Sequence, residues 1–267
     1  MIFTSNRYKN INLSLIAAVF ISLTGLFGLQ ACSSSSSTPV VNEDASGLFK
    51  GIGTVNTNTA LADVRGFVHG TRFMFFDEDT SVLYDGQITG IVASDITGTT
   101  DVYKDGVKVS TSTVTGTVTS QSTLSLTLTG SGYGAGSLSL TFDLLYNRSA
   151  TVAKLATISP ARWVGDPHTT AGGSVVRIKS VDIDDTIEGD TGAPYACLYT
   201  GTKSIPDATA NIYQLTLVVE EPGTTCDHEG TGYTGFFAVV DGSAAEDTLL
   251  FAATNGTNAN FSIMTVQ

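Results

Sequence analysis

From about residue 48 to its C-terminus, the chain alternates apolar and polar residues with a period of two. Three leucines alternate with serine and threonine between residues 124 and 129, and the pattern returns between residues 138 and 142. Successive side chains of a β-strand point to opposite faces of the sheet, so the alternation predicts strands with one buried face. A chain with this pattern over most of its length is expected to form antiparallel sheets.

Short turn signals separate these segments. Asp105-Gly106 predicts a tight hairpin, because glycine adopts positive φ at little cost. Residues 77–80 and 130–134 separate two further pairs of segments. No segment predicts a helix of ten residues or more, and only residues 150–156 suggest a short helical turn. The sequence therefore predicts an all-β fold, with antiparallel sheets that form a barrel-like or sandwich domain.

An aromatic residue followed two positions later by glycine recurs along the chain. The four occurrences are Phe49-Lys50-Gly51, Tyr84-Asp85-Gly86, Tyr199-Thr200-Gly201 and Tyr233-Thr234-Gly235. Glycine inside a strand often marks a bend or bulge, and a nearby aromatic side chain can cover the exposed backbone. The recurrence predicts two related β modules, residues 47–157 and 158–267. Chance is the alternative, since the chain contains 28 glycines.

The first 31 residues have the features of a secretory signal. Arg7 and Lys9 are their only charged residues, and an apolar segment follows from residue 11 to 29. Leu29-Gln30-Ala31-Cys32 then resembles the lipobox of bacterial lipoproteins, in which a diacylglycerol is attached to the cysteine and the chain is cut just before it. The resemblance implies a signal peptide at residues 1–31 and a membrane anchor on Cys32. An uncleaved transmembrane helix is the alternative, because the apolar segment is just long enough to span a bilayer.

Residues 32–46 are expected to form a flexible tether. Residues 33–37 are all serine, and serine-rich chain cannot bury enough apolar surface to fold. Ser33 rather than aspartate follows the cysteine, which in enterobacterial lipoproteins implies export to the outer membrane. We therefore expect a lipid-anchored protein of the bacterial outer membrane, on its periplasmic or its surface-exposed side.

The charge of the chain excludes one class of partner. There are 25 acidic and 13 basic residues, for a net charge of −12. Removing residues 1–31 takes away two basic residues and no acidic one, which leaves −14. Nucleic acid binding depends on clusters of lysine and arginine, so we expect no nucleic acid partner. The same balance argues against electrostatic docking on anionic lipid.

Two cysteines remain besides the predicted lipidation site. Cys197 and Cys226 form an even pair in a chain expected in an oxidising compartment, which predicts a disulfide between them. Two buried free thiols are the alternative. No histidine and asparagine pattern accompanies either cysteine, so a catalytic thiol is not expected.

Several local motifs occur in an order that looks like that of a group of uncharacterised proteobacterial lipoproteins. They are Tyr146-Asn147-Arg148-Ser149, Cys197 to Gly201, Asp207 with Asn211-Ile212-Tyr213, Cys226, and Tyr233-Thr234-Gly235. The motifs are loose but extend over most of the chain that follows residue 32. The resemblance implies a β-rich envelope protein and brings no known activity with it.

The densest acidic cluster is a weak candidate for a calcium site. It consists of Asp182, Asp184, Asp185 and Glu188, with Asp190 nearby. Oxygen ligands at short spacing suit Ca²⁺, but the cluster does not have the EF-hand spacing. A solvated acidic loop at the end of a strand is the alternative, and no other metal site is predicted.

The sequence predicts no catalytic residue and no cofactor. His69, His168 and His228 lack the spacing of zinc ligands. Residues 165–168, Gly-Asp-Pro-His, resemble the self-cleaving Asp-Pro site of von Willebrand type D domains, and an ordinary interdomain turn is the alternative.

These observations favour a non-enzymatic envelope scaffold that binds an unknown protein or glycan. One alternative is an extracytoplasmic hydrolase acting on glycans, which would require two carboxylates in a cleft. Another is a barrel that holds a lipophilic molecule, which would require an apolar cavity inside a closed sheet.

Overall fold

The computed structural model describes residues 40–56, 58–147, 163–165, 176–181, 186–191, 197–221, 226, 229–241 and 247–266. Every described residue belongs to one compact unit, residues 40–267. Among these residues, no helix has the length and the hydropathy needed to cross a membrane. The predicted helical turn at residues 150–156 and the predicted boundary at residue 157 lie outside the described residues.

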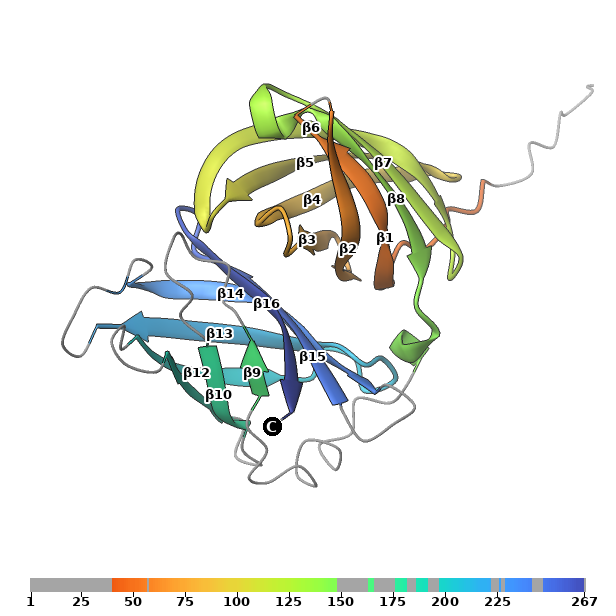
Figure 1. The fold of residues 1–267 in the computed structure, drawn as a ribbon. Coiled ribbons are helices and arrows are strands. Elements are labelled where there is room, and N and C mark those ends of the chain that lie inside the picture. Colours follow the sequence, from red (N-terminus) through yellow and green to blue (C-terminus); the bar gives the residue numbers. More distant parts are fainter. Residues whose placement is uncertain are drawn as a thin grey trace, which may run out of the picture. The chain divides into compact units, whose positions relative to one another are not determined.

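The first half of the described chain is a closed barrel of eight strands (Figure 1). The strands are β1 (Gly47–Val55), β2 (Thr59–His69), β3 (Arg72–Asp77), β4 (Val82–Val92), β5 (Asp95–Lys104), β6 (Val107–Thr119), β7 (Thr123–Thr129) and β8 (Gly136–Phe142). Each strand pairs antiparallel with the next, and β8 returns to β1. Two short 3₁₀ helices, η1 (Gly132–Gly134) and η2 (Leu144–Asn147), precede and follow β8.

The second half forms another eight-stranded antiparallel barrel. Its strands are β9 (Trp163–Gly165), β10 (Val176–Val181), β11 (Thr186–Thr191), β12 (Leu198–Ser204), β13 (Tyr213–Glu220), β14 (Gly230–Asp241), β15 (Asp247–Thr254) and β16 (Ala259–Val266). The three-residue strand β9 closes the sheet by pairing with both β10 and β16. The predicted all-β antiparallel fold is confirmed, in its barrel form.

The predicted hairpin at Asp105-Gly106 joins β5 to β6. Both residues have positive φ, 50° and 75°, as expected of a type I′ turn. Such a turn matches the right-handed twist of the strands that it joins. At the β3–β4 turn, the Asp77 carboxylate accepts a hydrogen bond from the Thr80 backbone N–H at 2.9 Å. These turns set the register of the first barrel.

Part of the predicted tether is bound to the first barrel. The Asn42 side chain accepts a hydrogen bond from the backbone N–H of Ala93 at 3.0 Å. Asp44 donates its backbone N–H to the Ser120 hydroxyl at 2.7 Å, and Ala45 is buried. We therefore expect the flexible part of the tether to end before Asn42.

Apolar side chains fill the interior of the first barrel. The predicted alternation is present on β7 and β8, where the leucines face inward and are at most 3% exposed. Phe73 and Phe75 stack inside, with ring centroids 5.5 Å apart. A Cβ atom added to Gly86 would lie 2.0 Å from the ring of Phe73. The packed rings therefore argue against a lipophilic ligand at this level of the first barrel.

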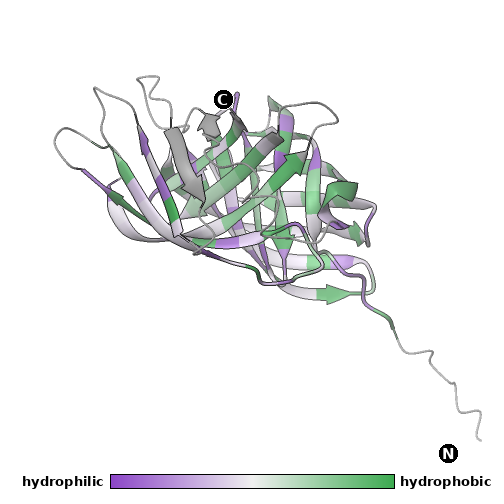
Figure 2. Ribbon diagram, turned by 90° about the horizontal axis from the view of Figure 1, so that it is seen from below, coloured by the Kyte–Doolittle hydropathy of each residue, from purple (hydrophilic) through white to green (hydrophobic). Residues whose placement is uncertain are grey.

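The opposite face of β6, β7 and β8 is polar. The exposed positions of these strands carry mostly threonine and serine, in register from strand to strand; Thr115, Thr127 and Ser137 form one such row. Figure 2 shows hydrophobic and hydrophilic residues interleaved along strands of the fold. These strands fit the prediction of one buried and one exposed face.

Other strands are buried on both faces, because the two barrels share an apolar layer. Phe67 and Phe76 point away from the interior of the first barrel, yet both are fully buried. The ring of Phe67 lies 6.2 Å from that of Phe236 on β14, and the ring of Phe76 lies 5.4 Å from that of Phe261 on β16. One continuous hydrophobic cluster thus includes residues of both barrels.

An arginine joins the two barrels beside this layer. Arg72 on β3 donates two hydrogen bonds to Asp85 on β4, at 2.9 and 2.8 Å. The same guanidinium donates to the hydroxyl and the backbone carbonyl of Thr234 on β14, at 3.0 and 3.1 Å. Thr254 on β15 donates its hydroxyl to Asp85. A bidentate arginine–carboxylate pair is among the strongest polar contacts, so it fixes how the strands meet.

We expect Phe261→Ala to lower the free energy of unfolding by about 3–5 kcal/mol, because it removes a buried ring from the shared layer. Urea denaturation of the purified chain measures this change. Thr115→Ala, on the exposed face of β6, is the control and should stay within about 0.5 kcal/mol of the parent. A Phe261→Ala variant as stable as this control would contradict the shared layer.

Candidate functional site

The interior of the second barrel contains a group of polar side chains among apolar ones. Tyr199 lies on β12, Tyr233 on β14, and Asn260 and Ser262 on β16. All four are buried. On β16 the alternation directs Asn260 and Ser262 inward, while Phe261 between them packs toward the first barrel. Polar groups buried in this way must find hydrogen-bond partners or reduce stability.

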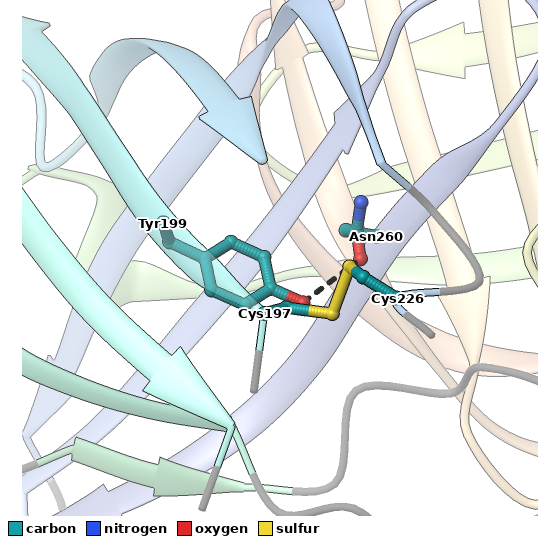
Figure 3. The surroundings of a disulfide bond; sticks show 4 residues. All are labelled: Cys197, Tyr199, Cys226 and Asn260. Atoms are coloured by element: carbon teal, nitrogen blue, oxygen red, sulfur yellow. Dashed lines mark hydrogen bonds between the residues drawn. A yellow bond between two sulfur atoms is a disulfide. The ribbon is translucent and has the colours of Figure 1, made fainter. Parts of the chain in front are cut away.

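The two tyrosine hydroxyls meet the side chain of Asn260. The Tyr199 hydroxyl donates to the Asn260 Oδ1 atom at 3.5 Å, a long and weak hydrogen bond (Figure 3). The side chains of Asn258 and Asn260 also lie close to the Tyr233 hydroxyl and favour its ionised form. The Asn260 Nδ2 atom and the Ser262 hydroxyl, in contrast, have no hydrogen-bond partner. The cluster is therefore only partly satisfied.

Burial disfavours ionisation of both tyrosines and raises their pKa values. It raises the pKa of Tyr233 to about 12, against the opposing effect of the nearby Asn258 and Asn260 side chains. Burial also raises the pKa of Tyr199 well above its usual range, and the nearby Tyr233 adds to this shift. At neutral pH both hydroxyls are thus protonated and can donate hydrogen bonds.

A disulfide lies next to this cluster. Cys197 and Cys226 are bonded, with Cα atoms 5.3 Å apart, and both are buried (Figure 3). The predicted disulfide is confirmed. Cys197 directly precedes β12, so the bond fixes the start of the strand that carries Tyr199.

Most of the predicted calcium ligands lie outside the described residues. Asp182, Asp184 and Asp185 lie outside the described residues, as does the predicted lipidation site Cys32. Glu188 is exposed on β11. Within the described ranges, no group of three or more histidine, cysteine or acidic side chains is arranged to hold a metal ion. The calcium site stays a prediction.

Of the three histidines and the Asp-Pro motif, the structure describes only His69. His168, His228 and the Asp166-Pro167 bond lie outside the described residues. His69 lies in the layer between the barrels, with its ring 6.0 Å from that of Phe236. Its Nδ1 atom is buried and has no hydrogen-bond partner.

Sequence reasoning did not find the polar cluster or the shared layer. One signal for the layer is present in the sequence. Residues 73–76, 236–240 and 249–253 are continuous apolar runs rather than alternating ones, which is typical of strands buried on both faces. No comparable signal marks Asn260, since a polar residue between two apolar ones fits ordinary alternation.

Comparison with known proteins gives little further information. No protein-family model matches the chain, and no curated protein matches its sequence. A solved structure, "The Structure of Intact Ap-TbpB (N and C lobes)", is similar with a TM-score of 0.27 and 10% identity. The match covers 79% of this chain but 63% of that one, so the chain spans less than two thirds of that structure. A likeness at this TM-score indicates neither fold nor function.

We expect stability to fall as the pH rises from about 10 to about 12. Burial raises the pKa of Tyr103 and Tyr233 from 10.0 to about 12, so in this interval only the unfolded chain loses these protons. Below about pH 10 these two groups contribute no pH dependence. Urea denaturation across the interval measures the effect. Tyr233→Phe keeps the ring and should reduce the slope, and an unchanged slope would refute the assignment to Tyr233.

Replacing both Cys197 and Cys226 by alanine should lower the free energy of unfolding by about 3–4 kcal/mol. The bond closes a loop over a sequence separation of 29, and without it the unfolded chain gains conformational freedom. Chemical denaturation with and without reductant provides the measurement and its control. Reductant should destabilise the parent and leave the double variant unchanged. Equal sensitivity of both proteins to reductant would contradict this prediction.

Proposed function

We propose that the chain is a lipid-anchored protein of the bacterial envelope, and that its barrels form a non-enzymatic scaffold for a protein or glycan partner. The observation that carries the proposal is the position of Cys32, directly after Leu29-Gln30-Ala31 and directly before five serines. A cut before Cys32 would leave the acylated cysteine as the first residue of the folded protein.

The anchor has a clear physical basis. Each acyl CH₂ group buried in the bilayer contributes about 0.8 kcal/mol, so two or three chains on one cysteine retain a protein far longer than one chain does. Residues 33–41 would form the link to the first barrel. Fully extended, this segment reaches roughly 30 Å, which is long enough to keep the barrel clear of the lipid headgroups.

Two features support a place outside the cytoplasm. The disulfide between Cys197 and Cys226 is of the kind that forms and persists in oxidising compartments. Ser33, rather than aspartate, follows Cys32, which fits delivery to the outer membrane. The net charge of −14 for the chain without residues 1–31 favours a neutral or cationic partner over an anionic one.

Cys32→Ser is expected to abolish incorporation of a fatty-acid label and to release the protein from the membrane fraction. Metabolic labelling with a palmitate analogue in a Gram-negative host, followed by fractionation, measures both effects. The Cys197→Ser, Cys226→Ser double variant is the matched control, because it loses the two other cysteines and should keep the label. A Cys32→Ser protein that still carries fatty acid and stays with the membrane would overturn the proposal.

A further inference from the structure

The most exposed apolar side chains of the described residues lie at one end of the first barrel. Val40, Val41, Val92 and Leu144 are each between 66% and 83% exposed, and no other large apolar side chain in the described ranges is as exposed. Single exposed apolar residues are common on protein surfaces, whereas a group of them at one place marks a contact with a partner or a membrane.

The order of the strands places these four residues at the same end. Each strand of the barrel runs antiparallel to the next, so the start of β1 and the turns that follow β2, β4, β6 and β8 share one end. Val40 and Val41 precede β1, Val92 is the last residue of β4, and Leu144 begins η2 soon after β8. We call this end of the first barrel the anchor end, because the tether joins it.

Hydrogen bonds hold the parts of the anchor end together. Glu43 donates its backbone N–H to the carbonyl of Ala93 in the β4–β5 turn at 2.8 Å. The Glu43 carboxylate accepts the backbone N–H of Ser120 in the β6–β7 turn at 2.9 Å. Asn147 of η2 donates its side-chain amide to Gln121 of that same turn at 3.3 Å. The segments that carry the four apolar side chains are thus bound to one another through these turns.

The length of the tether keeps the anchor end close to the bilayer. This step rests on the proposed function, in which Cys32 carries the lipid. Residues 33–41 separate Cys32 from Asn42, which is bonded to the barrel. A flexible, serine-rich chain of this length spans on average only about 15–18 Å, roughly half of its extended length. Tethering at such short range gives an effective concentration of about millimolar, at which weak apolar contacts become significant.

Two exposed carboxylates at the anchor end select the kind of lipid. Asp44 lies just after the two valines, and Asp95 pairs with Val92 across the β4–β5 turn. Neither forms an ion pair with another described residue. Carboxylates repel anionic headgroups and attract the ammonium group of phosphatidylethanolamine. The charge of this end therefore suits a zwitterionic lipid surface that carries ammonium groups.

We propose that the anchor end rests on the bilayer surface, with its four apolar side chains among zwitterionic headgroups and its two carboxylates facing their ammonium groups. The contact determines which end of the scaffold faces the membrane. The β5–β6 turn, at the opposite end of the barrel, points away from the lipid. The hydroxyl-rich face of β6 to β8 stays free for a partner.

Fluorescence quenching tests the contact. The acylated chain is reconstituted in vesicles of phosphatidylethanolamine and phosphatidylcholine that carry a quenching spin label on the headgroup. Val92→Trp and Leu144→Trp should be quenched. Val109→Trp, at an exposed position on β6 near the opposite end, is the matched control and should be quenched no more than the parent, whose single tryptophan is Trp163. Equal quenching of Val92→Trp and Val109→Trp would overturn the proposal.

The chemistry of the contact is tested in the Val92→Trp chain. Adding Val41→Asp should shift the equilibrium toward the free state by about tenfold, since burying a valine side chain is worth about that factor. Val109→Asp is the control and should leave the quenching unchanged. Phosphatidylglycerol in place of phosphatidylethanolamine should weaken the quenching, and stronger quenching in phosphatidylglycerol would contradict the proposal.

A second copy of the chain is the other occupant to test. Acrylamide quenching of Val92→Trp is measured without lipid, at increasing protein concentration. Constant accessibility of the tryptophan supports the contact with lipid. Protection that increases with concentration would show that this end binds a second copy, and would overturn the proposal.

Failure of this inference can be distinguished from failure of the proposed function. An acylated chain that stays on the vesicles without quenching at Val92→Trp refutes the contact and leaves the anchor standing. A purified chain without fatty acid refutes the anchor. Coupling the Cys32 thiol to a maleimide lipid then supplies an anchor, because the other two cysteines are joined in the disulfide, and the same quenching comparison decides the contact.

Discussion

The apolar layer between the two barrels is the contact on which the rest of the structure depends. An isolated barrel has its core inside and needs only a polar exterior. Here the outer faces of both barrels carry fully buried aromatic rings, including Phe67 and Phe76 on one side and Phe236 and Phe261 on the other. Burying each such side chain contributes about 1.5–3 kcal/mol, so exposing this face to water would be costly. Both barrels therefore belong to one compact unit.

Because of this layer, some strands are exposed on one face and others are buried on both. Strands β6 to β8 have one apolar face and one hydroxyl-rich face, which leaves that side of the first barrel open to solvent. Strands β14 to β16 give one face to their own interior and the other to the partner barrel. Arg72 joins the two barrels beside the layer, because its planar guanidinium donates hydrogen bonds to Asp85 and to Thr234 at the same time. Polar contacts fix the geometry that the apolar layer stabilises.

The sequence predicted the strands best where one face is exposed. Leu124 to Leu128 and the Asp105-Gly106 turn were placed correctly, because alternation and positive φ are local properties. The contacts between strands of different barrels depend on the whole fold. A continuous apolar run such as residues 236–240 indicates burial on both faces, but it does not show which face packs against the other barrel. The cluster around Asn260 could not be predicted either, since its missing hydrogen bonds depend on the small residues that the register places beside it. The anchor on Cys32 stays a prediction from the sequence.

The aromatic-x-glycine pattern has a structural cause that sequence reasoning described only in part. Leu83-Tyr84-Asp85-Gly86 and Leu198-Tyr199-Thr200-Gly201 lie on β4 and β12, the fourth strands of their barrels in chain order, and the relation between the two modules stays a prediction. The copies on β1 and β14 occupy different places, so common origin alone does not account for the pattern. A Cβ atom at Gly201 would lie 2.1 Å from the Thr216 carbonyl oxygen, and one at Gly86 would strike Phe73 on the neighbouring strand rather than meet Tyr84. Gly201 is thus required by the close approach of the neighbouring strand, whereas Gly86 leaves room for the Phe73 ring, which covers it from across the sheet.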